Sequence, residues 1–294
     1  MVKRSLSISA PSSLSIERRQ LIMRQGSAVI NTAPLEDLAI IVVDTPETTW
    51  TSALLAECGD FGIAVVFCGG KHLPCSILLP SVGNHLMAYV QRKQLDAKLP
   101  TKKRLWQTII SAKIMSQADT LRSLGKNDEP LRRLLRNVRS GDPTNVEGNA
   151  AARYFPLMFG TGFIRDPELI GLNSRLNYGY AILRAAVARA IVLSGLDPSV
   201  GIWHHNRYNP FPLADDLIEP IRPVVDKCVY ESLNLFPDDL ELTPPIKRHL
   251  LQVLTAEVSW AGARFPLDTA LERFCAQVRE ALTEGGSDVQ CPTV

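Results

Sequence analysis

Hydrophobic residues follow two different periods along the chain, and the change falls near residue 83. Residues 5–9 alternate polar and apolar side chains, a pattern typical of a half-buried strand. Residues 38–43 and 63–67 are short apolar runs rich in β-branched side chains, which also favour strands. Residues 51–58 predict one short helix, capped by Thr49 or Thr51 and stopped at Gly59. The first part of the chain therefore predicts a small β-rich domain.

After residue 83, apolar positions recur at helical spacing. Residues 180–190 are rich in alanine and predict a strong helix that ends near Gly195, and residues 250–261 and 267–282 predict two more helices. No strand pattern of comparable strength follows. The sequence therefore predicts an α+β protein with three parts: a β-rich domain (1–82), a larger all-α domain (83–283) and a disordered tail (284–294).

Composition narrows the class of protein. The chain has 294 residues, of which 46% are hydrophobic, enough for a sizeable core. No apolar run reaches the roughly 18 residues of a membrane span. The charged N-terminus lacks the apolar stretch of a secretory signal, so we expect a soluble, cytoplasmic protein. Six cysteines without a close Cys-x-x-Cys pair predict buried thiols rather than a zinc site.

Charge is unevenly distributed. The whole chain carries only +2, but residues 91–140 hold thirteen Lys and Arg against four Asp and Glu, a net +9. Such a segment attracts phosphate backbones. The alternative is a solvated helix face, which is how most runs of charge are used.

Three short segments of the helical part concentrate side chains that can bind metal ions. Glu147 opens an alanine-rich helix, where a carboxylate can also simply complement the helix dipole. His204 and His205 stand together in a turn, where a histidine can be a ligand or a hydrogen-bonded structural residue. Asp216 and Glu219 fall within about 60° of each other on a helical face, and their repulsion is relieved by a cation or by exposure to solvent.

Four stretches resemble the Cas1 family of CRISPR-associated adaptation integrases. They are Ala33–Asp44, Glu147–Ala151, Leu176-Asn177-Tyr178-Gly179-Tyr180 and Gly201–Pro223. They occur in the family's order over most of the chain, and the two-domain organisation agrees. The compact length and the motif Leu213-Ala214-Asp215-Asp216 most resemble the type II members of the family.

The resemblance implies a metal-dependent DNA integrase and endonuclease, whose helical domain is catalytic. New spacer DNA would enter a CRISPR array by transesterification, with a 3′-hydroxyl attacking a phosphodiester. The metal ligands and catalytic residues would be Glu147, His204 and Glu219, with Mg²⁺ or Mn²⁺ as cofactor, since carboxylates and imidazole suit these ions. Asp216 and His205 are auxiliary candidates.

The resemblance also implies partners. These are DNA (the donor duplex and the CRISPR repeat), a homodimer formed by residues 1–82, and a heterohexamer with the small partner Cas2. Type II relatives further depend on the RNA-guided effector nuclease. We assign DNA contacts to Arg132, Arg133, Arg136, Arg184 and Arg189, the last two of which could instead pair with acids.

Two other functions fit less well. A free-standing metal-dependent DNase would use the same three ligands. A non-catalytic DNA-binding scaffold would need none of them, and their presence argues against it.

Overall fold

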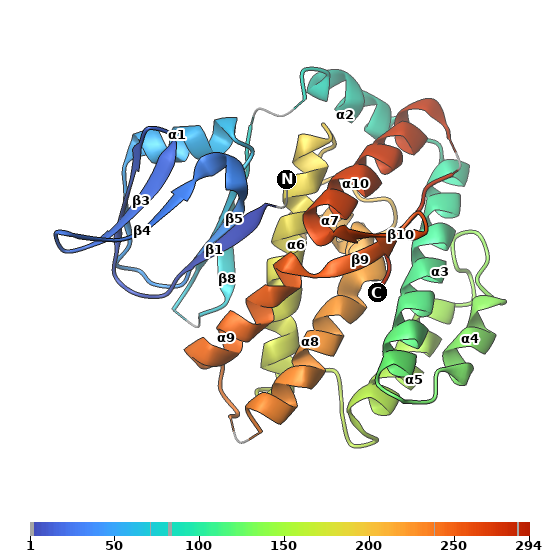
Figure 1. The fold of residues 1–294 in the computed structure, drawn as a ribbon. Coiled ribbons are helices and arrows are strands. Elements are labelled where there is room, and N and C mark those ends of the chain that lie inside the picture. The colour runs from blue at the N-terminus through green and yellow to red at the C-terminus, as the bar shows by residue number, and fades with distance from the viewer. Residues whose placement is uncertain (1–2, 71, 82–83, 238, 287) are drawn as a thin grey trace.

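The fold has strands in its N-terminal part and mostly helices in the rest, as predicted (Figure 1). The structure, a computed structural model, describes residues 3–70, 72–81, 84–237, 239–286 and 288–294. The expected domain boundary falls on residues 82 and 83, which lie outside these ranges.

The N-terminal part contains two four-stranded sheets. The first has the order β1-β5-β7-β8 and is formed by β1 (Arg4–Ile8), β5 (Leu38–Val43), β7 (Ala64–Cys68) and β8 (Pro74–Leu78). The second has the order β4-β3-β2-β6 and is formed by β4 (Ala28–Pro34), β3 (Gln20–Gln25), β2 (Ser13–Glu17) and β6 (Thr49–Trp50). The three predicted strands are β1, β5 and β7, which pair in parallel. All six residues of β5 are buried, which explains why its sequence is continuously apolar.

The predicted short helix is α1 (Ser52–Asp60). The Thr51 hydroxyl accepts a hydrogen bond from the Leu54 backbone N–H at 3.4 Å, so Thr51 rather than Thr49 is the cap. The helix ends at Asp60, two residues beyond the predicted end.

The helical part is organised around one long central helix. Its helices are α2 (Met87–Leu95), α3 (Leu99–Ser123), α4 (Glu129–Leu135), α5 (Val146–Phe159), α6 (Leu172–Leu193), α7 (Pro212–Leu217), α8 (Arg222–Leu235), α9 (Pro244–Leu250) and α10 (Leu267–Glu284). Helix α6 lies between the β-rich part and the other helices (Figure 1). Among the described residues it alone is long and apolar enough to cross a membrane, but 78% of that stretch is buried inside the fold, as in a core helix.

Two predictions for the C-terminal region are wrong. Residues 250–261 do not form one α-helix: α9 ends at Leu250, a 3₁₀ helix follows over Leu251–Thr255, and β9 (Glu257–Trp260) then pairs with β10 (Ala263–Pro266) as an antiparallel hairpin. Ala261 and Gly262 at its turn have φ of 53° and 79°, the backbone that two-residue hairpin turns require. The larger domain is mostly helical, as expected, and this hairpin is a local addition to it.

The tail is not disordered over residues 288–294. The backbones of Ser259 and Thr293 exchange two hydrogen bonds of 2.8 and 2.9 Å, and Val289 is buried. The hairpin provides a free strand edge, and a polar tail can pair with such an edge.

One hydrophobic cluster joins the two parts of the chain, and a second cluster, which includes Leu21, Ile41 and Leu54, lies within the β-rich part. Ile40 and Val42 of β5 belong to the same buried cluster as the helices. A buried ion pair also joins the parts: Lys247 Nζ of α9 lies 2.5 Å from Asp44 Oδ2, directly after β5. The helical domain is thus packed against the first sheet.

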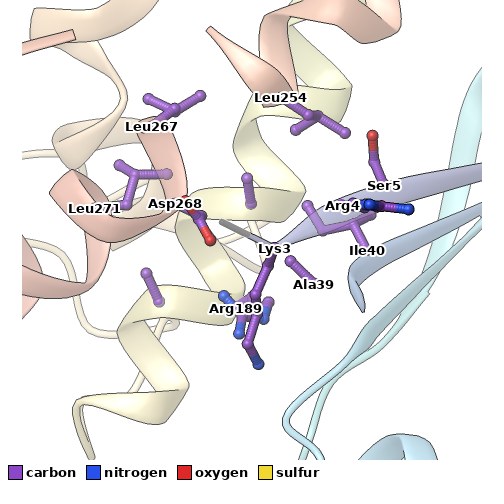
Figure 2. Close-up of a pocket in the computed structure, with 12 residues that line it drawn as sticks. Lys3, Arg4, Ser5, Ala39, Ile40, Arg189, Leu254, Leu267, Asp268 and Leu271 are labelled. Atoms are coloured by element: carbon purple, nitrogen blue, oxygen red, sulfur yellow. The ribbon is translucent and has the colours of Figure 1, made fainter. Parts of the chain in front are cut away.

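A small hollow remains at this junction, as Figure 2 shows. Lys3, Arg4 and Ile40 come from the strand side, and Leu254, Leu267 and Leu271 from the helical side. Its volume of about 20 Å³ has room for about one water molecule. The hollow is too small to hold a nucleotide.

All six cysteines lie in the described ranges and are free. Cys58, Cys228 and Cys275 are buried as predicted, whereas Cys75 is exposed. Burial raises the pKa of the Cys58 thiol to about 11, which makes it unreactive.

Candidate metal and DNA-processing site

Glu147 lies in the first turn of α5, whose start is strongly capped. Asp142 accepts hydrogen bonds from the backbone N–H groups of Val146 and Glu147 at 2.8 and 2.9 Å. The Asn145 side chain accepts from Gly148 N–H at 3.2 Å. Because these two residues already satisfy the helix terminus, the Glu147 carboxylate is free to interact elsewhere.

Glu219 lies in a tight 3₁₀ turn, Glu219–Ile221, between α7 and α8. Its side chain is only 6% exposed. Burial by itself would raise the pKa of this carboxyl, but Arg222 and Lys113 outweigh it and hold the pKa below its ordinary value. Glu219 is therefore a buried carboxylate.

One ammonium group joins the two glutamates. Lys113, in the middle of α3, places Nζ 2.5 Å from Glu147 Oε1 and 2.5 Å from Glu219 Oε2. Burial by itself lowers the pKa of Lys113, yet Glu219 and Glu147 raise it above its ordinary value. Two carboxylates from different elements thus converge on a single cation.

His204 is fixed by the buried carboxylate of Asp216. His204 Nδ1 lies 2.7 Å from Asp216 Oδ1, and the same carboxylate accepts the backbone N–H groups of Ile202, Trp203 and His204 at 2.6, 3.0 and 3.1 Å. The hydrogen bond to Asp216 raises the pKa of His204. A donating Nδ1–H leaves the lone pair on Nε2, the tautomer found in many carboxylate–histidine–metal sites.

The Gly201-x-x-His204 motif requires glycine at its first position for steric reasons. A Cβ at Gly201 would meet the His204 carbonyl oxygen at 2.4 Å and Asp216 Oδ2 at 3.2 Å. Any side chain there would therefore push His204 away from Asp216.

Asp216 and Glu219 do not face a common cation, contrary to the helical-face prediction. Helix α7 ends at Leu217, so the two acids point in different directions: Asp216 holds the loop of His204, and Glu219 meets Lys113. Both Asp216 oxygens are engaged, so this residue positions His204 rather than serving a metal directly.

His205 is exposed and lines a hollow together with His204, Asn206 and Lys102. The ring of Trp106 stacks on Trp203 at 5.6 Å and meets His204 edge-on at 5.6 Å. Trp106 is therefore a packing residue.

A second buried carboxyl lies behind the glutamates. The Tyr180 hydroxyl donates a hydrogen bond to Asp226, and Arg222 lies over the Tyr180 ring at 4.8 Å. Burial raises the pKa of Asp226 to about 6. These residues line one pocket with Lys113, Glu147 and Glu219.

The arginines assigned to DNA are not equivalent. Arg133 and Arg136 are exposed on and beside α4, and Arg133 forms a surface ion pair with Glu129 at 2.9 Å. Arg132 instead pairs with Asp119 and Asp128, each at 2.6 Å. It joins α4 to α3 and has a structural role.

The remaining two arginines pair with acids. Arg184 Nε lies 2.8 Å from Asp215 Oδ1. Arg189 is 2% exposed, donates to the Gly62 carbonyl at 2.6 Å and pairs with Glu272 at 3.0 Å. The structure contradicts the assignment of Arg189 to DNA, because the domain junction encloses its guanidinium.

The three proposed donors suit a metal ion to different degrees. Glu147 and Glu219 fit, since a cation already sits between them. His204 adds a favourable charge interaction with Glu219, but lines the neighbouring hollow. Within the described ranges, no three His, Cys, Asp or Glu side chains form a ready metal cluster.

Sequence reasoning missed four charged residues of this pocket: Lys113, Arg165, Arg222 and Asp226. Lys113 follows an apolar helical pattern at Ile109, Ile110 and Ile114, so a lysine on that buried face was an available signal.

Fold and pocket together define a class: a protein with an N-terminal β-rich domain and a helical domain. The helical domain holds two glutamates, one of them buried, a carboxylate-bound histidine and basic side chains. The family described as "CRISPR associated protein Cas1" matches residues 6–236. The chain therefore belongs to the Cas1 family.

Individual proteins agree with this assignment. The CRISPR-associated endonuclease Cas1 of Neisseria meningitidis serogroup C (strain 8013) is 39% identical over 287 residues, which cover 97% of this chain and 93% of that protein. A casposase bound to integration product has a similar fold, with TM-score 0.78 and 19% identity over 98% of this chain and 92% of that one. A Cas6-RT-Cas1–Cas2 complex matches with TM-score 0.74 and 18% identity, over 97% of this chain and 35% of the other.

Proposed function

We propose that this protein is a metal-dependent DNA integrase that inserts spacer DNA into a CRISPR array and also cleaves DNA. The observation that carries the proposal is the convergence of Glu147 and Glu219 on one cation position inside a pocket of the helical domain. The relative named an endonuclease and the fold shared with a casposase support it.

Glu147, Glu219 and His204 would hold the metal ion, which we propose to be Mg²⁺ or Mn²⁺ because the donors are mainly oxygen. A bound divalent ion would supply positive charge for the phosphoryl group and orient the attacking oxygen. Asp216 keeps His204 in the tautomer and orientation in which Nε2 is available.

The chain's own cations also favour a phosphate at this pocket. Arg222 and Arg165 line it, and their positive charge attracts a phosphate backbone. In the reaction, a DNA 3′-oxygen bonds to the phosphorus while the bond to another 3′-oxygen breaks, and the proton moves from the attacking to the leaving oxygen. Water in place of the 3′-hydroxyl gives hydrolysis, so one site serves both activities.

We further propose that the protein works in the cytoplasm as a homodimer. Two dimers would be bridged by Cas2 in a heterohexamer that binds the donor duplex and the CRISPR repeat, with the RNA-guided effector nuclease as a further type II partner. The likeness to a solved complex containing Cas1 and Cas2 supports the Cas2 partner.

A strand-transfer assay tests the function. A short donor duplex is incubated with a supercoiled plasmid carrying a CRISPR array, Mn²⁺, and Cas2 or no Cas2. Glu147→Gln and Glu219→Gln should each abolish transfer while binding DNA normally, because phosphate contacts dominate affinity. Glu231→Gln, a change of an exposed residue on α8, is the matched control and should keep the wild-type rate.

The assay also separates the alternatives. Cleavage without transfer, with or without Cas2, would identify a free-standing DNase. Full transfer by both glutamine variants would contradict the proposed site.

A further inference from the structure

Lys113 occupies the position on which the two glutamates converge. Its side chain is 8% exposed, and its ammonium contacts Glu147 Oε1 and Glu219 Oε2, each at 2.5 Å. We infer that Lys113 is an internal counter-ion that holds these carboxylates together in the metal-free protein and gives way when a divalent ion binds. The inference rests on the proposed function, because it takes Glu147 and Glu219 as the metal-binding pair.

Both oxygens of Glu219 already have a cationic partner. Oε1 lies 3.0 Å from Arg222 Nε, and Oε2 lies 2.5 Å from Lys113 Nζ. A metal ion that binds Glu219 must therefore take an oxygen from one of these two cations. Lys113 also occupies the facing oxygen of Glu147, so a bridging ion has to compete with Lys113.

Lys113 can move more easily than Arg222. Arg222 is held against the Tyr180 ring at 4.8 Å and lies three residues from Glu219 in the same turn. Lysine carries a single ammonium on a flexible stem, unlike the rigid fork of arginine. One turn along α3, Gln117 Oε1 is buried and has no hydrogen-bond partner among the described residues. That oxygen is an acceptor for the displaced ammonium.

The charges explain why such a residue is useful. Two carboxylates brought together without a cation repel each other and favour an open arrangement. Lys113 supplies one positive charge and keeps both ligands oriented before the metal arrives. The same contact lowers metal affinity, because the ion must first displace the ammonium.

The test is Mn²⁺ affinity of the full-length protein, measured by electron paramagnetic resonance at one neutral pH. Lys113→Met should bind Mn²⁺ about tenfold more tightly than wild type, a gain of about 1.4 kcal/mol. Its metal-free form should melt at a lower temperature, and Mn²⁺ should raise that temperature by more than in wild type. A residue with a merely structural role would not tighten binding when removed.

Lys247→Met is the matched control, because Lys247 is also buried and lies 2.5 Å from its carboxylate partner, Asp44. It should lose stability without any change in Mn²⁺ affinity. Unchanged or weaker Mn²⁺ binding by folded Lys113→Met would overturn the inference.

A measurement on wild-type protein covers the case in which Lys113→Met does not fold. With ¹⁵N-labelled lysine, the Lys113 ammonium should give a protected NMR signal without metal, assigned by its absence in Lys113→Arg. Mg²⁺ should shift or remove that signal. A signal that stays unchanged at saturating Mg²⁺ would overturn the inference.

Glu219→Gln separates this inference from the proposed function. If wild type and Glu219→Gln bind Mn²⁺ equally, the proposed metal site is wrong and the inference falls with it. If Glu219→Gln loses Mn²⁺ binding while Lys113→Met binds like wild type, only the inference is wrong.

Discussion

At the scale of single residues, neighbours in the sequence have different surroundings. His204 and His205 are both exposed, but the His204 imidazole is tied to the buried Asp216 carboxylate at 2.7 Å. His204→Ala should therefore abolish strand transfer, and His205→Ala should change the rate only a few-fold. Asp216→Asn weakens the hydrogen bond that holds the imidazole, so it should lower the strand-transfer rate about 10- to 100-fold.

Steady-state strand transfer, with DNA binding measured in parallel, checks these rates. All three variants should bind DNA nearly as well as wild type. If His204→Ala were active and His205→Ala inactive, the metal ligand would be His205 rather than His204.

Asp226 makes a pH-dependent contribution to stability. Burial raises its pKa from 3.8 to about 6, so the folded protein binds this proton more tightly than the unfolded chain. The resulting stabilisation is complete below pH 3.8 and is lost as the pH rises to about 6. Asparagine is neutral at every pH. Near pH 3.8, Asp226→Asn should therefore be as stable as wild type. Above pH 6 the Asp226→Asn variant should be more stable than wild type by on the order of 3 kcal/mol.

Urea unfolding of both proteins across this pH range measures the difference directly. A difference that does not vary with pH would show that Asp226 does not titrate as described.

At the scale of elements, α4 carries the exposed part of the basic segment. Arg133 has a side chain that is 76% exposed, and Arg136 is exposed as well. Replacing both with alanine should weaken duplex binding. The slope of log affinity against log salt should fall by up to about 2, because each lost phosphate contact contributes about 0.9.

Arg132 is left intact in this experiment, since its pairs with Asp119 and Asp128 hold α4 on α3. Arg264→Ala, an exposed change on the β9–β10 hairpin, is the control and should leave the slope unchanged. An unaltered slope in Arg133→Ala/Arg136→Ala would show that α4 does not contact the DNA.

At the scale of the whole molecule, the two domains depend on each other. Lys247 and Asp44 are both 7% exposed and form an ion pair across the junction. Removing Lys247 takes a full positive charge away from the buried Asp44 carboxylate and leaves it the His72 imidazole at 2.8 Å. Lys247→Met should therefore lose on the order of 3 kcal/mol of stability.

The double variant Lys247→Met/Asp44→Asn should recover part of this loss, because no buried charge is then left unpaired. Guanidinium unfolding of the two single variants and the double variant measures the coupling. Additive losses would show that the pair does not couple the domains.

The local elements were predictable because their signals are local. The apolar run of β5, the Thr51 cap of α1 and the apolar spacing of α10 each depend on residues a few positions apart. The helix predicted over 250–261 failed for the opposite reason. Its apolar residues suit a helix, but pairing of β9 with β10 and with Thr293 decides the conformation.

For the site, the sequence by itself determined which side chains are chemically capable: Glu147, His204 and Glu219, in motifs that resemble a known family. Only the tertiary structure decided what each one meets. Lys113 is 34 residues from Glu147, and Asp44 is 203 residues from Lys247. The period of a helix tells which face is buried, but not which residue of another helix lies against it. That choice depends on how whole elements pack, so the counter-ion between the glutamates and the carboxylate that joins the domains emerged only from the fold.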